Sequence, residues 1–494
     1  MSRKLPMFYS AILLTVVNLM LRLVSTSFQV YISSRIGAAG VGLLQLVMSV
    51  GMLAMTAGMA GVRTGTMYLT AEELGKKRPH NVYWILRGCF LYSILCSGSI
   101  CIGLHAGAPW IARYWIGDIR TVGALRLFAT FLPINCLCGC MTGYFTAANR
   151  IGTLAIVEIG EQLCYMTVTM SALFLFAGND PAIACQCVVL GSGVSACMTL
   201  GSLIILRIRE KAPVGPRLPV KRRLLDTAVP LALADDLKSG ISTTENLMVP
   251  KRLSLYPGTA SPLAAFGMVC GMVFPVLMFP AAILFALAEL LIPELARCAA
   301  AGSEMRIQYL VRRSLRIALL YGCACAGLLF LLSKALCIRL YGSSEAGAYL
   351  RLYAWLAPML YCDAITDAMT KGLGQQKACV RYNILTSTMD VVFLYLLLPK
   401  YGMTGYFISF LVTHLLNFCL SLRRLLKISK THISFSAALL TGLAALAAGW
   451  GASFAPAIGM RIMGFLGIFG SLLVLFRIVS MEDVHWIKGL LQRK

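Results

Sequence analysis

Apolar segments long enough to cross a bilayer recur along the entire chain, separated by short polar connections. A helix of roughly 20 apolar residues spans the hydrocarbon core of a membrane. The longest polar connection is a basic, proline-containing stretch at 207–224, so none of the connections leaves room for a soluble domain. The pattern therefore predicts an all-α protein that crosses a membrane many times.

About fourteen spans are predicted from these segments. They lie at 6–32, 38–68, 83–106, 122–147, 153–177, 182–206, 226–250, 261–293, 312–333, 351–373, 381–399, 404–423, 433–452 and 460–480. The first segment is too long for the apolar region of a signal peptide, about 7–15 residues, and no small-residue cleavage site follows it. In the eighth segment Pro275, Pro280 and Pro293 are expected to interrupt the helix.

The composition agrees with a membrane protein. Hydrophobic residues make up 59% of the 494 residues and charged residues 13%, whereas soluble domains carry about 25% charged residues. The net charge of +24 would suggest a nucleic-acid partner in a soluble protein. Here the basic residues form short clusters between apolar segments, as in the cytoplasmic loops of membrane proteins. No nucleic-acid partner is expected.

The distribution of Lys and Arg also predicts the orientation. If the N-terminus is cytoplasmic, the connections on the cytoplasmic side hold nearly three times as many Lys and Arg residues as those outside. Such a bias is typical of the cytoplasmic side. With an even number of spans, both termini are expected in the cytoplasm, and the protein is expected in the bacterial cytoplasmic membrane.

The position of the basic stretch predicts the domain organisation. We expect an N-terminal lobe at 1–206, a cytoplasmic linker at 207–225, a C-terminal lobe at 226–423, and two further helices with a tail at 424–494. Ile32–Leu46 and Val249–Phe266 share a pattern: the end of a span, an Arg, a short glycine-containing loop and a new apolar run. Repeated halves are typical of transporters, whose substrate site lies at the interface of the repeats.

Polar residues in the first predicted span share one helix face. Asn18, Arg22, Ser25 and Gln29 recur at intervals of four, three and four residues, and we call this set the polar stripe. Polar groups deep in a span face a bundle interior or water. The stripe is interpreted as the wall of a substrate cavity in which Arg22 attracts an anionic group. An internal salt bridge or packing contact is the alternative.

Further ionisable residues occur in other spans. The seventh span adds candidate cavity residues, namely Asp235, Lys238, Ser242, Glu245 and Asn246. Candidate ion-coupling acids in other spans are Glu158, Glu161, Glu289, Asp363 and Asp367. These acids could bind a coupling proton or sodium ion, or neutralise nearby basic residues structurally. Both interpretations stay open for each of them.

Catalytic and metal-binding patterns are not found in the sequence. It has no G-x-S-x-G, H-E-x-x-H or P-loop motif, and its five histidines are scattered. The cysteines lie mostly inside apolar runs, where cysteine behaves as a small apolar residue. We therefore expect neither an enzyme nor a resident metal or cofactor, with coupling to H⁺, Na⁺ or the membrane potential left open.

Several segments resemble one family of transporters. They read YISSRIGAAGVGLLQL (Tyr31 to Leu46), LMVPKRL (Leu247 to Leu253), FGMVCGMVFPVLMFPAAI (Phe266 to Ile283), LIPELA (Leu291 to Ala296), KGLGQQKACVRYNI (Lys371 to Ile384) and LPKYGMTGYFIS (Leu398 to Ser409). In order and spacing they resemble the multidrug/oligosaccharidyl-lipid/polysaccharide flippase superfamily. Within it, they look most like the stage V sporulation protein B branch of polysaccharide-biosynthesis flippases.

This resemblance implies a V-shaped bundle of two six-helix lobes, like that of the related MATE exporters, with two additional C-terminal helices. It also implies transfer of an undecaprenyl-linked oligosaccharide or peptidoglycan precursor across the membrane by alternating access, for envelope or spore-cortex synthesis. The expected partners are the lipid-linked glycan, membrane lipids and envelope-synthesis enzymes. Lipid II flippases of the superfamily usually carry a second Arg followed by an acid, where this chain has Phe28 and Gln29.

Two alternatives to a precursor flippase are kept. A cation-coupled multidrug exporter of the same fold needs an ion-binding acid, and the first span contains none. A membrane scaffold for envelope enzymes would not transport, so neutralising its cavity charges would have no effect.

Overall fold

A computed structural model of the chain describes residues 7–178, 180–209, 221–431, 435–476 and 478. These residues form helices with short connections and contain no strand, which confirms the predicted all-α class. Most of the predicted linker, at 210–220, lies outside the described residues, as do the N-terminal residues 1–6 and the tail from 479 onward.

By their packing, the helices divide into two compact units. The first unit comprises Met1–Gly271 and Val391–Gly405, and the second comprises Met272–Asp390 and Tyr406–Lys494. The first unit therefore includes the helix that follows the linker, which the sequence assigned to the C-terminal lobe. The division into lobes at 1–206 and 226–423 stays a prediction.

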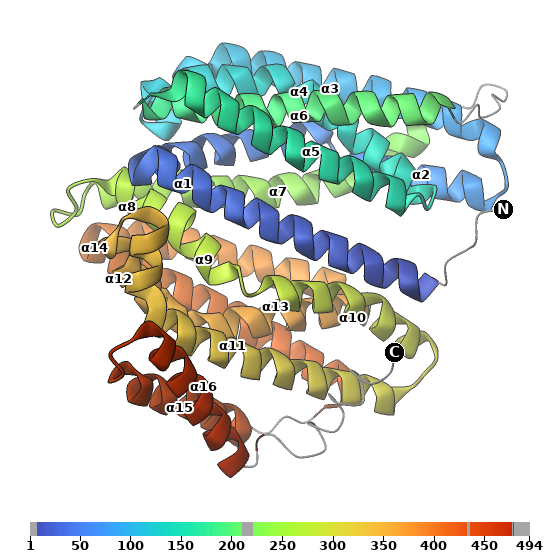
Figure 1. Cartoon of the computed structure of the whole chain (residues 1–494). Coiled ribbons are helices and arrows are strands. Elements are labelled where there is room, and N and C mark those ends of the chain that lie inside the picture. The colour runs from blue at the N-terminus through green and yellow to red at the C-terminus, as the bar shows by residue number, and fades with distance from the viewer. Residues whose placement is uncertain (1–6, 179, 210–220, 432–434, 477, 479–494) are drawn as a thin grey trace. The chain divides into compact units, whose positions relative to one another are not determined.

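The first unit is built from long helices joined by tight turns. Its helices are α1 (Met7–Met59), α2 (Val62–Gly75), η1 (Pro79–Asn81), α3 (Val82–Trp110), η2 (Ile111–Ile116), η3 (Ile119–Thr121), α4 (Val122–Ala147), α5 (Ile151–Ala172), η4 (Leu173–Ala177), α6 (Pro181–Arg209), α7 (Lys221–Leu253) and α8 (Pro262–Met268). Helices α3, α4, α5 and α6 lie side by side (Figure 1), each packed on its neighbour in the order α3, α4, α6, α5.

Glycine divides the two longest helices into pairs of spans. Gly37 breaks α1 with φ 70° and ψ 171°, and Gly402 breaks α14 (Gln376–Ser429) with φ 59° and ψ −138°. Both conformations strongly favour glycine because a Cβ would clash with the backbone. Each break lies between two predicted spans, after 6–32 and after 381–399. The structure thus confirms the position of both interruptions.

The second unit contains the remaining helices. These are η5 (Val269–Val273), which begins in the first unit, α9 (Phe274–Met278), α10 (Ala282–Ala300), α11 (Glu304–Tyr341), α12 (Ser344–Tyr353), η6 (Ala354–Leu356), α13 (Ala357–Gly372), most of α14, α15 (Phe435–Ser453) and α16 (Ile458–Leu475).

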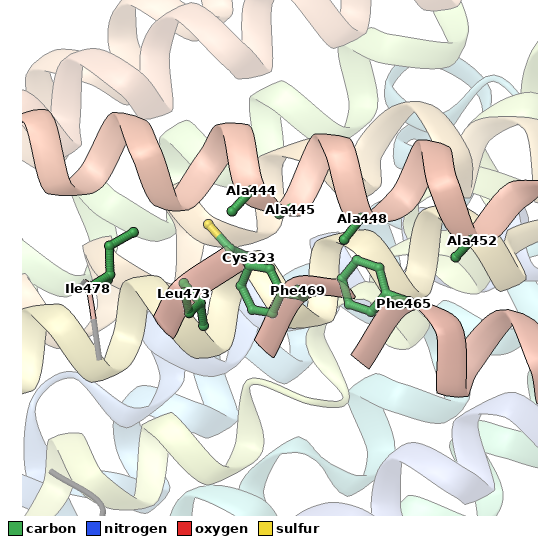
Figure 2. Packing of buried hydrophobic residues seen from close by; sticks show 9 residues of the cluster. All are labelled: Cys323, Ala444, Ala445, Ala448, Ala452, Phe465, Phe469, Leu473 and Ile478. Atoms are coloured by element: carbon green, nitrogen blue, oxygen red, sulfur yellow. The ribbon is translucent and has the colours of Figure 1, made fainter. Parts of the chain in front are cut away.

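The two C-terminal helices pack on α11 through an apolar cluster. Figure 2 shows Phe465 and Phe469 of α16 lying along four alanines of α15, with Cys323 of α11 beside them. The alanines Ala444, Ala445, Ala448 and Ala452 recur on one face of α15, and their small side chains leave room for the stacked rings, whose centroids are 5.6 Å apart. Burial of two aromatic side chains fixes this helix pair to the second unit.

Length and hydropathy identify nine of the described helices as candidate spans, or ten if the bent pair Pro262–Met278 and Ala282–Ala300 forms one span. Two of the nine contain the glycine breaks described above. The bend of 65° in the pair lies at Pro280, in agreement with the predicted interruption, whereas Pro293 lies inside the continuous helix α10. The predicted number of fourteen is not confirmed by this criterion.

Contacts within the first unit bring predicted external segments to one end. The Lys251 amino group donates a hydrogen bond to the Tyr114 carbonyl oxygen, and the Arg252 guanidinium lies 3.2 Å from the ring centre of Tyr395. At the other end Arg223, next to the predicted cytoplasmic linker, binds acids near the α2–α3 turn. This placement agrees with the prediction that successive connections alternate between the two sides of the membrane. Which end faces the cytoplasm stays a prediction.

Candidate functional site

The polar stripe lies along the edge of the contact between α1 and α5. Phe28 is buried, and its ring meets the Tyr165 ring edge-on at 5.2 Å. This contact fixes the rotation of α1, so that Arg22 and Ser25 are exposed and Gln29 is half-buried. The described side chains of the stripe therefore lie outside the apolar core of the unit. The side chain of Asn18 lies outside the described part of the structure.

A cavity of about 300 Å³ lies beside the stripe, between α1, α5 and α6. We call it the acidic cavity. It is lined by Leu21, Glu158, Glu161, Gln162, Tyr165, Ser192 and Ser195. Glu158 and Glu161, three residues apart, lie on the same face of α5 and both line it. The structure thus brings together two of the predicted ion-coupling acids, next to the residue that precedes Arg22.

The acidic cavity also has polar neighbours on other helices. Arg63 of α2 lies close enough to Glu158 for an electrostatic attraction, and Thr199 of α6 lies beside Glu161. The side-chain nitrogen of Gln162 has no hydrogen-bond partner among the described residues. Sequence spacing relates residues on one helix only, so it could not place α2 and α6 against α5.

This arrangement suits binding of a cation, a proton or hydroxyl groups. Carboxylates accept hydrogen bonds and bind hard cations, while serine hydroxyls and a free amide can complete the set of oxygen and nitrogen contacts. Two carboxylates near one another are also costly to keep ionised together, which favours uptake of a proton or cation. Among the described residues no group of three His, Cys, Asp or Glu side chains is arranged to hold a metal ion.

Helix α7 is fixed to α1 by polar contacts. Thr243 donates a hydrogen bond of 3.0 Å to the Ser49 carbonyl oxygen, and Asn246 donates one of 3.0 Å to the Ser49 hydroxyl. Asn246, a predicted cavity residue, thus makes a structural contact. Asp235, Lys238 and Ser242 are exposed, and Glu245 is half-buried. None of these five predicted residues lines the acidic cavity.

The predicted acids of the second unit have different surroundings. Asp363 accepts hydrogen bonds from the Asn417 amide at 3.2 and 3.4 Å. Asp367 forms an ion pair with Lys371, one turn along α13, at 2.6 Å. Glu289 is exposed on α10. Asp367 thus pairs with a basic residue of its own helix, which was one of the two interpretations of the predicted acids. Asp363 instead contacts a polar side chain of another helix.

Comparisons with known proteins agree with this architecture. The MatE family model matches residues 11–175. Stage V sporulation protein B of Bacillus subtilis (strain 168) is 21% identical over 504 aligned positions, covering 96% of this chain and 96% of that protein. A multidrug resistance MATE family transporter of the MOP superfamily, in an inward-facing conformation, superposes with a TM-score of 0.67 at 13% identity, over 85% of this chain and 100% of the other.

The lipid II flippase MurJ, in an inward closed conformation, superposes with a TM-score of 0.69 at 12% identity. The match covers 94% of this chain and 99% of the flippase. The chain has the fold of the MOP superfamily. It is therefore a multi-pass membrane protein, and the resemblance predicted from its sequence segments is confirmed. The stage V sporulation protein B relative matches along nearly the full length of both chains, so the similarity is not confined to the MatE region.

Proposed function

We propose that this chain is a flippase that moves an undecaprenyl-linked oligosaccharide or peptidoglycan precursor across the cytoplasmic membrane by alternating access. The main support is the match to stage V sporulation protein B over 96% of each chain. The MATE exporter covers 85% of this chain and the lipid II flippase covers 94%. The flippase comparison therefore accounts for more of the chain.

In this proposal the polar stripe binds the substrate and the acidic cavity binds the coupling ion. Arg22 is exposed on α1 and attracts the pyrophosphate of the lipid-linked substrate, because guanidinium groups bind phosphate through paired hydrogen bonds. Glu158 and Glu161 bind the coupling H⁺ or Na⁺ in the same unit. The isoprenyl tail stays in the bilayer while the polar headgroup crosses.

The orientation and partners belong to the same proposal. Both termini lie in the cytoplasm, as the excess of Lys and Arg on that side predicts. The partners are the lipid-linked glycan and the surrounding lipids, with envelope-synthesis enzymes supplying the substrate and using it after transfer. The protein acts as a transporter and performs no chemical conversion of its own.

The test is complementation of a bacterial host that lacks its own envelope-precursor flippase. Wild type and Arg22→Ala are compared at matched membrane levels, with Arg297→Ala as the control because Arg297 is 72% exposed in the last turn of α10. We expect growth with the wild type and the control, and loss of growth with Arg22→Ala. Growth with all three would remove Arg22 from the mechanism. No growth with a well-expressed wild type would contradict precursor transfer and favour drug export or scaffolding.

A further inference from the structure

A second cavity in the first unit lies where α1 breaks. It has a volume of about 490 Å³ and lies between the end of the first arm of α1, η4 and the start of α6. We call it the Arg35 cavity. It is lined by Tyr31, Ser34, Arg35, Ile36, Gly37, Leu173, Phe174, Gly178, Asp180, Pro181 and Ala184. None of these residues lines the acidic cavity, so the two are separate.

The Arg35 cavity lies at the level where spans end. The candidate span formed by α5 and η4 ends at Phe176, and the one formed by α6 begins at Pro181. The residues between them form one of the connections predicted to be external. Lipid phosphate groups lie at this boundary between the hydrocarbon core and water. The cavity is therefore placed to meet a lipid headgroup and not the middle of an acyl chain.

Arg35 supplies the positive charge of the cavity. Its guanidinium lies 6.0 Å from the ring centre of Tyr31, its side chain is exposed, and within the described part of the chain no carboxylate pairs with it. An Arg without a carboxylate partner in a concave site is well suited to bind phosphate.

The acid in the same cavity is engaged elsewhere. Asp180 accepts a hydrogen bond of 2.8 Å from the Ala182 amide at the start of α6, and Arg120 lies close enough to attract it electrostatically. Arg120 in turn donates three side-chain hydrogen bonds to the Asp118 carboxylate, of 3.0, 3.1 and 2.6 Å. These bonds hold the pKa of the Asp118 carboxyl below its ordinary value. The charge of Asp180 is thus partly offset by Arg120.

The part of the cavity wall formed by η4 is apolar and continues into exposed apolar side chains. Phe174, Leu175 and Phe176 of η4 are 83%, 68% and 65% exposed, and Phe174 and Leu173 line the cavity itself. A ligand with a phosphate at one end and a hydrocarbon chain at the other satisfies both walls at once. A free phosphate ion would leave the apolar wall without a contact.

We infer that the Arg35 cavity is a binding site for an amphiphilic phosphate ester or diphosphate at the membrane boundary opposite the predicted cytoplasmic side. Arg35 binds the phosphate, and Phe174 contacts the first carbons of the lipid chain. The transported lipid after transfer and a bulk phospholipid share this chemistry. The inference extends the proposed function. It depends on the proposed function only if the bound ligand is the transported lipid and not a bulk phospholipid.

The test uses the full-length protein in phosphatidylcholine nanodiscs and a photoreactive farnesyl diphosphate, with labelled peptides identified by mass spectrometry. We expect labelling of the peptide that contains Phe174. Arg35→Gln should reduce this labelling at least tenfold, Arg35→Lys should retain part of it, and Arg113→Gln should leave it unchanged. Arg113 is the matched control because it is an exposed Arg in a predicted external connection, η2, outside the cavity.

Competition identifies the ligand. Excess farnesyl diphosphate should abolish the labelling, and farnesol or inorganic pyrophosphate alone should have little effect. Competition by phosphatidylglycerol as strong as by farnesyl diphosphate would support the site and assign it to bulk phospholipid. Equal competition by pyrophosphate would overturn the amphiphilic ligand, and equal labelling of Arg35→Gln and wild type would overturn the site. Because no transport is measured, this result is independent of the complementation test. A thermal unfolding scan of each variant separates loss of binding from loss of folding.

Discussion

Acidic residues inside the spans differ in what surrounds them, and this difference predicts which of them take part in transport. Glu158 and Glu161 line one cavity with serine hydroxyls, whereas Asp367 is paired with Lys371 on its own helix. Replacing both glutamates (Glu158→Gln with Glu161→Gln) should lower the transfer rate at least tenfold, because an amide does not take up a proton at neutral pH and lacks the negative charge with which a carboxylate binds a cation.

The measurement is transfer of a fluorescent lipid-linked oligosaccharide in proteoliposomes under an imposed H⁺ or Na⁺ gradient. Asp367→Asn is the control and should change the rate by less than about twofold, since a local ion pair with partly exposed partners contributes little. A double glutamate variant that keeps both the rate and its dependence on the gradient would exclude this cavity from coupling.

At the scale of single residues, the sequence identifies helix faces but not partners. The three-residue spacing of Glu158 and Glu161 correctly predicts that they share a face of α5. It contains no information on Arg63 or Ser192, which approach from α2 and α6. The same limit applies to Asn246, whose contact with Ser49 joins residues almost two hundred positions apart in the chain. Side-chain polarity alone could not distinguish this structural contact from a cavity position.

The start of α7 is held to α2 by ion pairs of Arg223 with a buried and a partly exposed glutamate, which predicts an effect on stability. Arg223 donates hydrogen bonds of 2.9 Å to Glu73 and 2.8 Å to Glu72. Glu73 also accepts a hydrogen bond of 2.8 Å from the Asn81 side-chain amide. Glu73 is only 2% exposed. Arg223→Ala should therefore destabilise the protein by about 1–3 kcal/mol, because a buried carboxylate loses its charged donor.

The apparent melting temperature in detergent, at a fixed scan rate, measures this effect. Arg306→Ala removes an ion pair with Glu294 in which the side chains are 66% and 31% exposed, so it should lower the melting temperature by much less. Equal melting temperatures for Arg223→Ala and the wild type would mean that α7 is not held at this point.

Helices α1 and α8 approach each other closely enough that glycine is required between them. A Cβ on Gly267 would lie 2.1 Å from the Ala38 carbonyl oxygen and 2.4 Å from the Gly42 amide nitrogen, both backbone atoms. Gly267→Ala should force the helices apart and destabilise the first unit by about 1–3 kcal/mol. Gly98→Ala is the matched control, because nothing lies within 4 Å of its Cβ position and alanine favours a helix. A Gly267→Ala protein as stable as the control would contradict the backbone contact.

At the scale of helices, the agreement with the sequence depends on local signals. The predicted span at 122–147 coincides with α4, and the breaks at Gly37 and Gly402 lie between predicted spans, because glycine and apolar periodicity act locally. The region of the predicted span at 351–373 contains the end of α12, the 3-10 turn η6 and α13, which follow one another without a non-helical residue. Pro358 lies in the first turn of α13, where proline is favoured, so the sequence does mark the start of this helix.

At the scale of the whole molecule, the predicted topology depends on which end of each helix faces the cytoplasm. The helix α11 offers a direct test because it begins at Glu304 after the Gly302 turn and ends at Tyr341 before Ser343. Its apolar length makes it a candidate span, so its two ends should lie on opposite sides of the membrane. The distribution of Lys and Arg places Gly302 in the cytoplasm and Ser343 outside.

Short epitope tags inserted after Gly302 or after Ser343 should therefore behave oppositely in spheroplasts. Antibody should bind the Ser343 tag in intact spheroplasts and the Gly302 tag only after permeabilisation. The reverse pattern would invert the whole predicted topology, and the Arg35 cavity would then face the cytoplasm, where the lipid-linked substrate enters. Both tags on one side would mean that α11 does not span. Because alternating access requires a defined direction of transfer, this result decides whether the Arg35 cavity is the exit or the entrance of the proposed pathway.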